Sequence, residues 1–164
     1  MNTEDLERFD PQKMYQTYDN WPIYSESAFR KEFSKIQLQD IDHVVLAGMG
    51  GSGAIGDVIS AILSREDIHV SNVKGYLLPK TVDERTLVIS TSISGNTKET
   101  LSILDYKEKS KAKFVAISSG GIMKEKCMKN SITHYDISMI HSPRASFTTF
   151  LYSILNIFED VLPI

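Results

Sequence analysis

The chain has 164 residues, of which 41% are hydrophobic and 24% are charged, and this size and composition suit one compact globular domain. The formal net charge of −3 argues against a nucleic-acid-binding protein, which normally carries a basic face. The lone Cys127 cannot form an internal disulfide, which fits a reducing cytoplasm. The N-terminus M-N-T-E-D-L-E-R is too acidic for a signal peptide, and no apolar run approaches about 18 residues, so we expect neither secretion nor a membrane span.

Residues 1–40 are largely charged and are expected to be helical. Pro22 predicts a turn within an aromatic cluster, whose members are Tyr15, Tyr18, Trp21 and Tyr24. The segment 27–36 predicts a surface helix from the helical spacing of Phe29, Phe33 and Ile36. We expect residues 1–40 to form a helical N-terminal arm that packs its aromatic side chains onto a domain at residues 41–164.

From residue 43 onward, short β-branched runs alternate with segments of helical periodicity. Three runs are continuously apolar, which is typical of strands that are buried on both faces of a parallel sheet. These runs are residues 43–47, 86–90 and 113–118, with further strand candidates at 73–79 and 132–137. Helical periodicity occurs at about residues 53–64, 96–109, 122–129 and 144–161. The alternation predicts an α/β fold with a central parallel sheet and helices on both of its faces.

The stretch G-M-G-G-S-G at residues 48–53 follows the first predicted strand and leads into a helix. Such a glycine-rich turn is typical of an anion site, usually one for a phosphate. It lacks the Lys-Ser/Thr pair that ends a Walker-type nucleotide loop. It matches G-x-G-x-x-G, but the acidic pair Glu66–Asp67 precedes the second predicted strand instead of ending it, which argues against a dinucleotide site.

A second polar loop, S-T-S-I-S-G-N-T at residues 90–97, follows another predicted strand of the same sheet. Ligands of such sheets bind beyond the carboxyl ends of the strands, so the two loops are expected at one edge. The hydroxyl groups of Ser92 and Ser94, with free amides at a helix start, would suit a phosphate. Ordinary capping by Asn96, with Glu99 three residues later, is the alternative. Capping leaves the paired serines unexplained, so we favour phosphate binding.

Three stretches together resemble the signatures of one known family. They are G-M-G-G-S-G-A-I-G-D at residues 48–57, S-I-S-G-N-T-K-E-T at 92–100 and S-P-R-A-S-F at 142–147. In order and spacing they resemble the bifunctional phosphoglucose/phosphomannose isomerase family, within the sugar isomerase (SIS) domain superfamily. The resemblance implies an SIS-type three-layer sandwich without a metal or cofactor. It also implies isomerisation of glucose 6-phosphate or mannose 6-phosphate to fructose 6-phosphate through an enediolate.

The resemblance also implies roles for single residues. Gly51 and Ser52 would contact the open-chain sugar, and Ser92, Ser94 and Thr97 would hold the phosphate. Arg144 would stabilise the negative charge of the enediolate, a role that a fixed guanidinium suits. The alternative for Arg144 is a surface ion pair at a helix start, where a cation is unfavourable.

The family's general base, ring-opening group and lysine come from a second SIS domain, and this chain ends at Ile164, about where the first domain should finish. We therefore expect the base to come from a missing second half or a partner. Four residues of this chain could be considered as local substitutes: His134, His141, Glu125 and Glu159. None is next to a recognisable loop motif, and a solvated or core role is favoured for each.

The apolar residues of segment 145–162 spread beyond one narrow stripe of a helix. Left uncovered, such a helix would expose a patch of the kind that marks protein interfaces, so we expect a homodimer or a second SIS-domain chain as partner. A non-catalytic sugar-phosphate sensor or regulatory module remains the alternative function, because Ser92, Ser94 and Thr97 fit both equally well.

Overall fold

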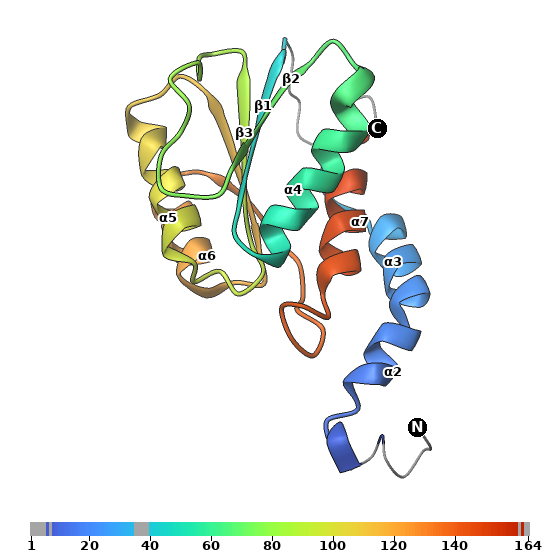
Figure 1. Ribbon diagram of the computed structural model, residues 1–164. Helices are drawn as coiled ribbons and strands as arrows, with labels where there is room; N and C mark the ends of the chain where they lie inside the picture. The colour runs from blue at the N-terminus through green and yellow to red at the C-terminus, as the bar shows by residue number, and fades with distance from the viewer. Residues whose placement is uncertain (1–5, 7, 35–39, 161, 163–164) are drawn as a thin grey trace.

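The centre of the protein is a five-stranded parallel sheet, seen here in a computed structural model that describes residues 6, 8–34, 40–160 and 162 (Figure 1). The strands are β1 (His43–Gly48), β2 (His69–Val73), β3 (Thr86–Ser92), β4 (Lys113–Ser118) and β5 (Thr133–Asp136). Their order is β2-β1-β3-β4-β5, and each neighbouring pair runs parallel. The predicted α/β fold with a central parallel sheet is confirmed.

Helices cover both faces of this sheet (Figure 1). They are α4 (Gly51–Ile62), α5 (Lys98–Leu104), α6 (Gly121–Lys129) and α7 (Phe147–Phe158), with 3-10 turns at Leu63–Arg65 and Asp105–Glu108. Because successive strand residues face opposite sides, Val44 and Leu46 pack with α4 and α7, whereas Val45 packs with α5 and α6. Every residue of β1 and β3 is buried, which explains the continuous apolar runs of these two strands.

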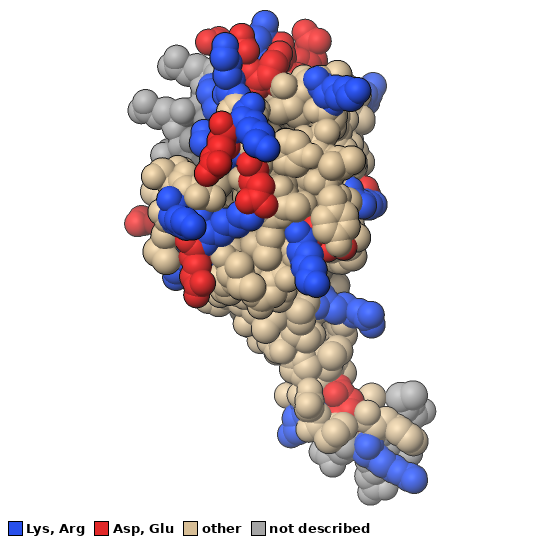
Figure 2. All heavy atoms as spheres, turned by 90° about the vertical axis from the view of Figure 1, so that its left-hand side faces the viewer, with Lys and Arg blue, Asp and Glu red and all other residues tan. Residues whose placement is uncertain are grey.

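The sheet is preceded by the helices α2 (Met14–Asp19) and α3 (Trp21–Arg30), and Pro22 lies in the first turn of α3. α3 packs along α7, whereas α2 extends past the end of the sheet at which α4 begins (Figures 1 and 2). The Asn156 side-chain amide donates a hydrogen bond to the Phe29 carbonyl, and the Tyr135 hydroxyl donates one to the Ser34 carbonyl at 2.6 Å. Residues before the first strand therefore contact the domain at both α7 and β5.

Two element predictions were wrong. β2 occupies residues 69–73, and the predicted strand at 73–79 is mostly loop. β2 lies at the edge of the sheet and is only partly buried, so its sequence lacks the continuous apolar run that predicts a buried strand. The helix expected at 27–36 ends at Arg30, because Lys31 is extended with φ −67° and ψ 133°; Ile36 lies outside the described residues.

The C-terminal helix α7 does not expose the apolar patch that we expected. Phe150, Ile154 and Phe158 are buried in the core shared with the sheet, and α3 covers a further face of α7. Among the described residues of α7, Tyr152 is the large hydrophobic side chain that stays exposed, at 38%. The patch was predicted because the sequence does not reveal that the chain's own α3 lies against α7.

Candidate functional site

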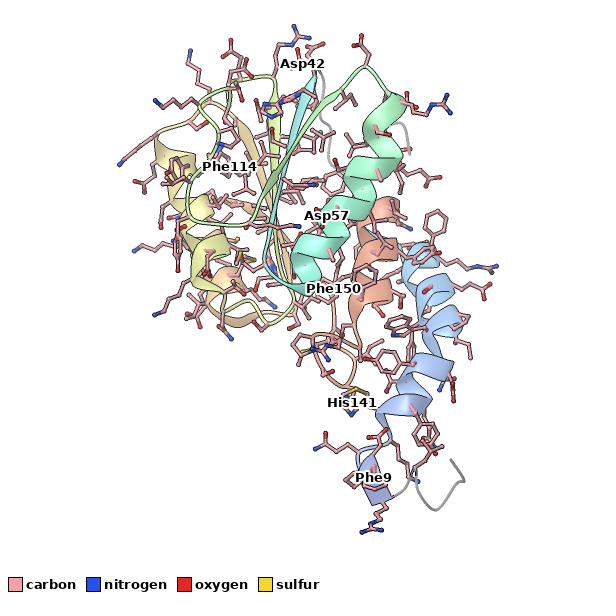
Figure 3. All side chains as sticks on the ribbon, viewed as in Figure 1. Phe9, Asp42, Asp57, Phe114, His141 and Phe150 are labelled. Atoms are coloured by element: carbon pink, nitrogen blue, oxygen red, sulfur yellow. The ribbon has the colours of Figure 1, made fainter. Side chains whose placement is uncertain are left out.

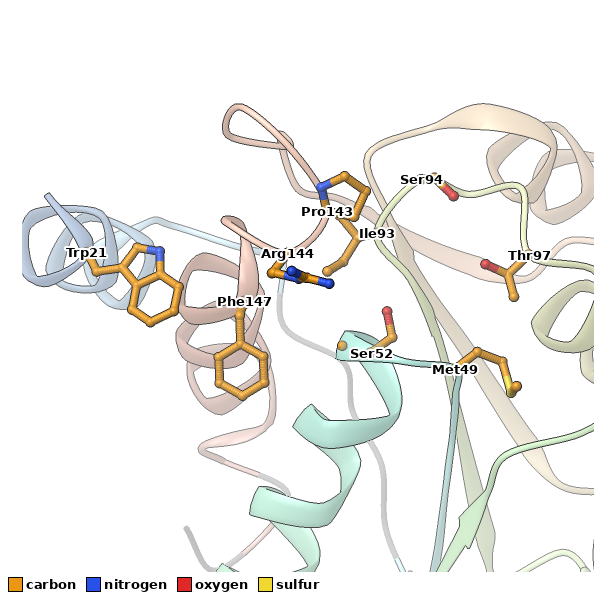
Figure 4. A pocket seen from close by; sticks show the side chains of 10 residues that line it. Trp21, Met49, Ser52, Ile93, Ser94, Thr97, Pro143, Arg144 and Phe147 are labelled. Carbon is orange, nitrogen blue, oxygen red and sulfur yellow. The ribbon is translucent and has the colours of Figure 1, made fainter. Parts of the chain in front are cut away.

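Two polar loops and the segment before α7 enclose one pocket of about 440 Å³ at the carboxyl ends of the strands (Figure 4). The loops meet because β1 and β3 are neighbours in register, with Gly48 opposite Thr91. The pocket is lined by Trp21, Met49, Gly51, Ser52, Ile93, Ser94, Thr97, Pro143, Arg144 and Phe147. Five of the six predicted site residues are in this set, and the sixth, Ser92, lies directly beneath it.

The first loop needs glycine at two positions to turn the chain from β1 into α4. A side chain at Gly48 would place its Cβ 2.7 Å from the Ser52 backbone, and Gly50 has a positive φ of 54°. The tight turn lets α4 begin at Gly51, and the Ser52 and Gly53 amides donate hydrogen bonds of 3.1 and 3.3 Å to the Met49 carbonyl in the turn. Ser52 is buried, and its side chain points into the pocket (Figure 4).

In the second loop, Ser94 and Thr97 line the pocket, whereas Ser92 supports them from below. The Ser92 hydroxyl lies 2.9 Å from the Thr97 hydroxyl and accepts a hydrogen bond of 3.1 Å from the Gly95 amide. Ser92 is 1% exposed, so its hydroxyl is closed to the pocket and supports Thr97 and the loop backbone instead. Hydroxyl groups held in this way form a donor-rich surface for an oxyanion.

The structure contradicts the alternative explanation of the second loop, which was capping of α5 by Asn96 and Glu99. Thr97 is the N-cap residue of α5, and the Asn96 side chain instead accepts a hydrogen bond of 3.1 Å from the Ile122 amide at the start of α6. Glu99 accepts a hydrogen bond from the Tyr76 hydroxyl, which raises the pKa of Tyr76. Neither Asn96 nor Glu99 caps α5, so capping does not explain the residues of this loop.

Arg144 lies on the opposite wall, in the irregular segment between β5 and α7. Ser146 holds this segment: its hydroxyl accepts a hydrogen bond of 2.8 Å from the Ile140 amide and contacts the Ser142 carbonyl at 2.8 Å. Arg144 is exposed, is the one charged side chain among the lining residues and forms no ion pair within the part of the chain that the structure describes. The surface ion pair that was its alternative role is thus absent from that part of the chain.

Five lining residues were not predicted as site residues: Trp21, Met49, Ile93, Pro143 and Phe147. The last four lie inside the three sequence signatures, so their positions could have been included. Trp21 could not, because it reaches the pocket from α3, where its indole Nε1 donates a hydrogen bond of 2.7 Å to the Ala145 carbonyl.

The candidate local bases do not line the pocket. His134 contacts the Ser118 hydroxyl at 2.8 Å, and burial lowers its pKa. His141, Glu125 and Glu159 are exposed. Among the described residues, no group of three or more His, Cys, Asp or Glu side chains could hold a metal ion, and no helix is long and apolar enough to cross a membrane.

The dinucleotide alternative finds no support at the end of β2. Val73 ends this strand and Lys74 follows it, with its ammonium 2.6 Å from the Asp57 carboxylate. A dinucleotide site would need an acidic residue at the end of β2 to bind the ribose, and this chain has Lys74 there.

The parallel sheet and its helices form an α/β fold, and comparison with known families identifies that fold. Residues 37–156 match the SIS domain family, and the chain belongs to that family. Over 137 residues it is 36% identical to the bifunctional phosphoglucose/phosphomannose isomerase of Caldicellulosiruptor bescii, covering 81% of this chain and 40% of that protein. Over 120 residues it is 37% identical to the protein of the same name from Thermoplasma volcanium, covering 71% and 36%. The resemblance seen in the three sequence signatures is thus confirmed, and the chain spans less than half of either relative.

Solved structures share the fold at lower sequence identity. The C-terminal domain of glucosamine-fructose-6-phosphate aminotransferase from Francisella tularensis superposes with a TM-score of 0.68 at 17% identity, over 87% of this chain and 46% of that one. This similarity supports the three-layer α/β sandwich.

Proposed function

We propose that this chain is the sugar-phosphate-binding SIS domain of a phosphoglucose/phosphomannose isomerase-like protein, with a hexose 6-phosphate as ligand. One observation carries the proposal: two loops that were each assigned to phosphate or sugar from their sequence open into one pocket, opposite an arginine that forms no ion pair with any described residue. The curated relatives named above carry the matching activity in their names.

The phosphate is proposed to bind at the wall formed by the second loop. The Ser94 and Thr97 hydroxyls donate to its oxygens, and Ser92 orients Thr97 from below. Hydrogen bonds to a charged acceptor contribute roughly 1.5–3 kcal/mol each, so a few of them hold a dianion without a lysine. Gly51 and Ser52, at the positive end of α4, contact the sugar between the two walls.

Arg144 is proposed to stabilise charge on the reacting end of the open-chain sugar. In the isomerisation a base removes the proton from C2, and the electrons form an enediolate that is negative at O1. The proton is then delivered to C1 while the O2 proton moves to O1, so the composition of the sugar is unchanged. A guanidinium fixed beside O1 stabilises the charge as it develops, which lowers the barrier more than it tightens ground-state binding.

The general base is proposed to come from outside this chain, either a second SIS domain or a second copy. The support is the composition of the pocket: among the described residues that line it there is no Asp, Glu, His or Lys. A proton transfer needs a base within hydrogen-bond reach of C2 or one water away. The same observation favours a second candidate function, a sugar-phosphate sensor, which needs affinity but no base.

The proposal is tested by calorimetric titration of the purified chain with glucose 6-phosphate. Ser94→Ala is expected to weaken the affinity by roughly 1–3 kcal/mol, because one hydrogen bond to a charged acceptor is lost. Ser64→Ala is the matched control, since Ser64 is an exposed serine whose hydroxyl bonds to the Ala61 carbonyl at the far end of α4. An unchanged dissociation constant in Ser94→Ala would show that the phosphate binds elsewhere.

A coupled assay for fructose 6-phosphate then separates the two candidate functions. Binding without turnover, both alone and after addition of a second SIS domain from a relative, would support the sensor. Turnover that appears only with the added domain would support the isomerase.

A further inference from the structure

Trp21 reaches the pocket from outside the segment that matches the SIS family. It is the first residue of α3, and residues 37–156 are the matched segment. Pro22 lies in the first turn of this helix, a position at which proline favours a helix start, so Trp21 stands at the end of α3 that faces the pocket. Trp21 is also the single tryptophan of the chain.

The Trp21 ring forms the end of the pocket opposite the hydroxyl groups (Figure 4). Ser94 and Thr97 lie on one side, Trp21 and Phe147 on the other, with Ser52 and Arg144 between them. The ring centroids of Trp21 and Phe147 are 6.5 Å apart, and Tyr18 packs edge-on against Trp21 at 4.8 Å. A ligand whose phosphate meets the hydroxyl wall therefore directs its uncharged end toward an aromatic wall.

Trp21 is also bonded to the backbone that carries Arg144. Its indole N–H donates a hydrogen bond of 2.7 Å to the carbonyl of Ala145, the next residue after Arg144 and one that is fully buried. Removal of this donor leaves a buried carbonyl without that partner, which is costly unless the backbone moves. The bond thus restrains the position from which the Arg144 side chain extends.

A weak electrostatic interaction also links the same two parts of the molecule. The Asp10 carboxylate accepts hydrogen bonds from the amides of Tyr15 and Met14, which lower its pKa, and the nearby His141 acts in the same direction. His141 lies in the segment before α7, on the side of the N-terminal helices (Figure 3). The N-terminal residues therefore approach the Arg144 segment at two separate points.

We propose that Trp21 is a specificity-determining residue that sets the sugar end of the pocket: its ring forms the wall and its N–H positions the Arg144 backbone. This inference rests on the proposed function, because it assumes a ligand with a phosphate at one end and a sugar at the other. The N-terminal arm then contributes to ligand selection rather than only to packing. Inorganic phosphate, which has no sugar, is bound without help from Trp21.

The test compares two ligands on the full chain by calorimetry, glucose 6-phosphate and inorganic phosphate. Trp21→Ala is expected to weaken glucose 6-phosphate binding about tenfold and to leave phosphate binding within twofold. Trp21→Phe keeps a ring but loses the N–H, and about a threefold loss for the sugar phosphate is expected. Phe29→Ala is the matched control, because it removes an aromatic ring from the other end of α3, where Phe29 packs on Tyr152. This control should bind glucose 6-phosphate and inorganic phosphate with the affinities of the wild type.

The outcomes separate this inference from the proposed function. If Trp21→Ala weakens the binding of both ligands equally, Trp21 has a structural role. If the affinity for both ligands is unchanged, Trp21 does not contribute to the binding site. Either result overturns this inference and leaves the proposed function standing. Absence of binding by the wild type overturns the proposed function and the inference with it. A second readout does not need the variants: saturating glucose 6-phosphate should shift the tryptophan emission and protect it from acrylamide quenching, and binding without either change contradicts the inference.

Discussion

The two walls of the pocket are built in different ways. The hydroxyl wall comes from residues 92–97, directly after a buried strand, and is held by bonds within the loop, such as Ser92 with Thr97, and by bonds from residues 119–123 at the start of α6. The aromatic wall joins α3 to the segment before α7, and its main hydrogen bond links Trp21 with Ala145, 124 positions apart. Bonds within the loop and to the start of α6 fix the first wall to the sheet, whereas the second depends on how the N-terminal helices dock. We therefore propose that the phosphate is held by the sheet and its neighbouring loops and that selection among sugars rests on the docked helix.

The largest effect is expected from a substitution that disturbs the hydroxyl wall through its backbone. Gly95 has φ +71°, and a Cβ at this position would lie 1.9 Å from the Gly120 carbonyl oxygen. Gly95→Ala must therefore move the loop or the start of α6, and we expect the free energy of unfolding to fall by about 2–4 kcal/mol in urea denaturation. Gly75→Ala is the control, because nothing lies within 4 Å of its added Cβ. Equal stability of the two variants would refute the rigidity of this wall.

A smaller effect on stability and affinity should distinguish Ser94, which faces the pocket, from Ser92, which supports the loop. Ser92→Ala removes a buried hydroxyl that bonds to Thr97, so it should reduce both the stability and the affinity for glucose 6-phosphate, by about 0.5–1.5 kcal/mol each. Ser94→Ala should reduce mainly the affinity. A double-mutant cycle of Ser92→Ala with Thr97→Ala measures the coupling, and strictly additive losses would contradict an effect that passes through Thr97.

The smallest effect concerns two histidines that do not line the pocket, His43 at the start of β1 and His134 on β5. Burial, and then the neighbouring His69, lower the pKa of His43 from its usual 6.5, and burial lowers that of His134. Below pH 6.5 the unfolded chain takes up protons at these positions that the folded chain does not, so stability should fall as the pH drops from 7 toward the lowered pKa values. Thermal unfolding between pH 5 and 8 checks the slope. His43→Gln should flatten this slope, and a slope unaffected by His43→Gln would count against the assignment.

The contrast between the walls also explains how much the sequence could predict. β1, β3 and β4 were predictable because burial on both faces leaves a continuous apolar run, and their loops carry glycines and hydroxyls where a ligand would lie. β2 was misplaced because an edge strand is only partly buried. Trp21 was assigned to a packing cluster because no local pattern indicates that α3 docks on α7 beside Arg144. Asn96 was misassigned for the same reason, since its partner, Ile122, belongs to another helix.

The most direct test of the account is a crystal structure of the chain with glucose 6-phosphate. We expect the phosphate within hydrogen-bond distance of the Ser94 and Thr97 hydroxyls, and the C1–C2 end between Arg144 and Trp21. A phosphate bound at Arg144, or a ligand found away from the two loops, would contradict it.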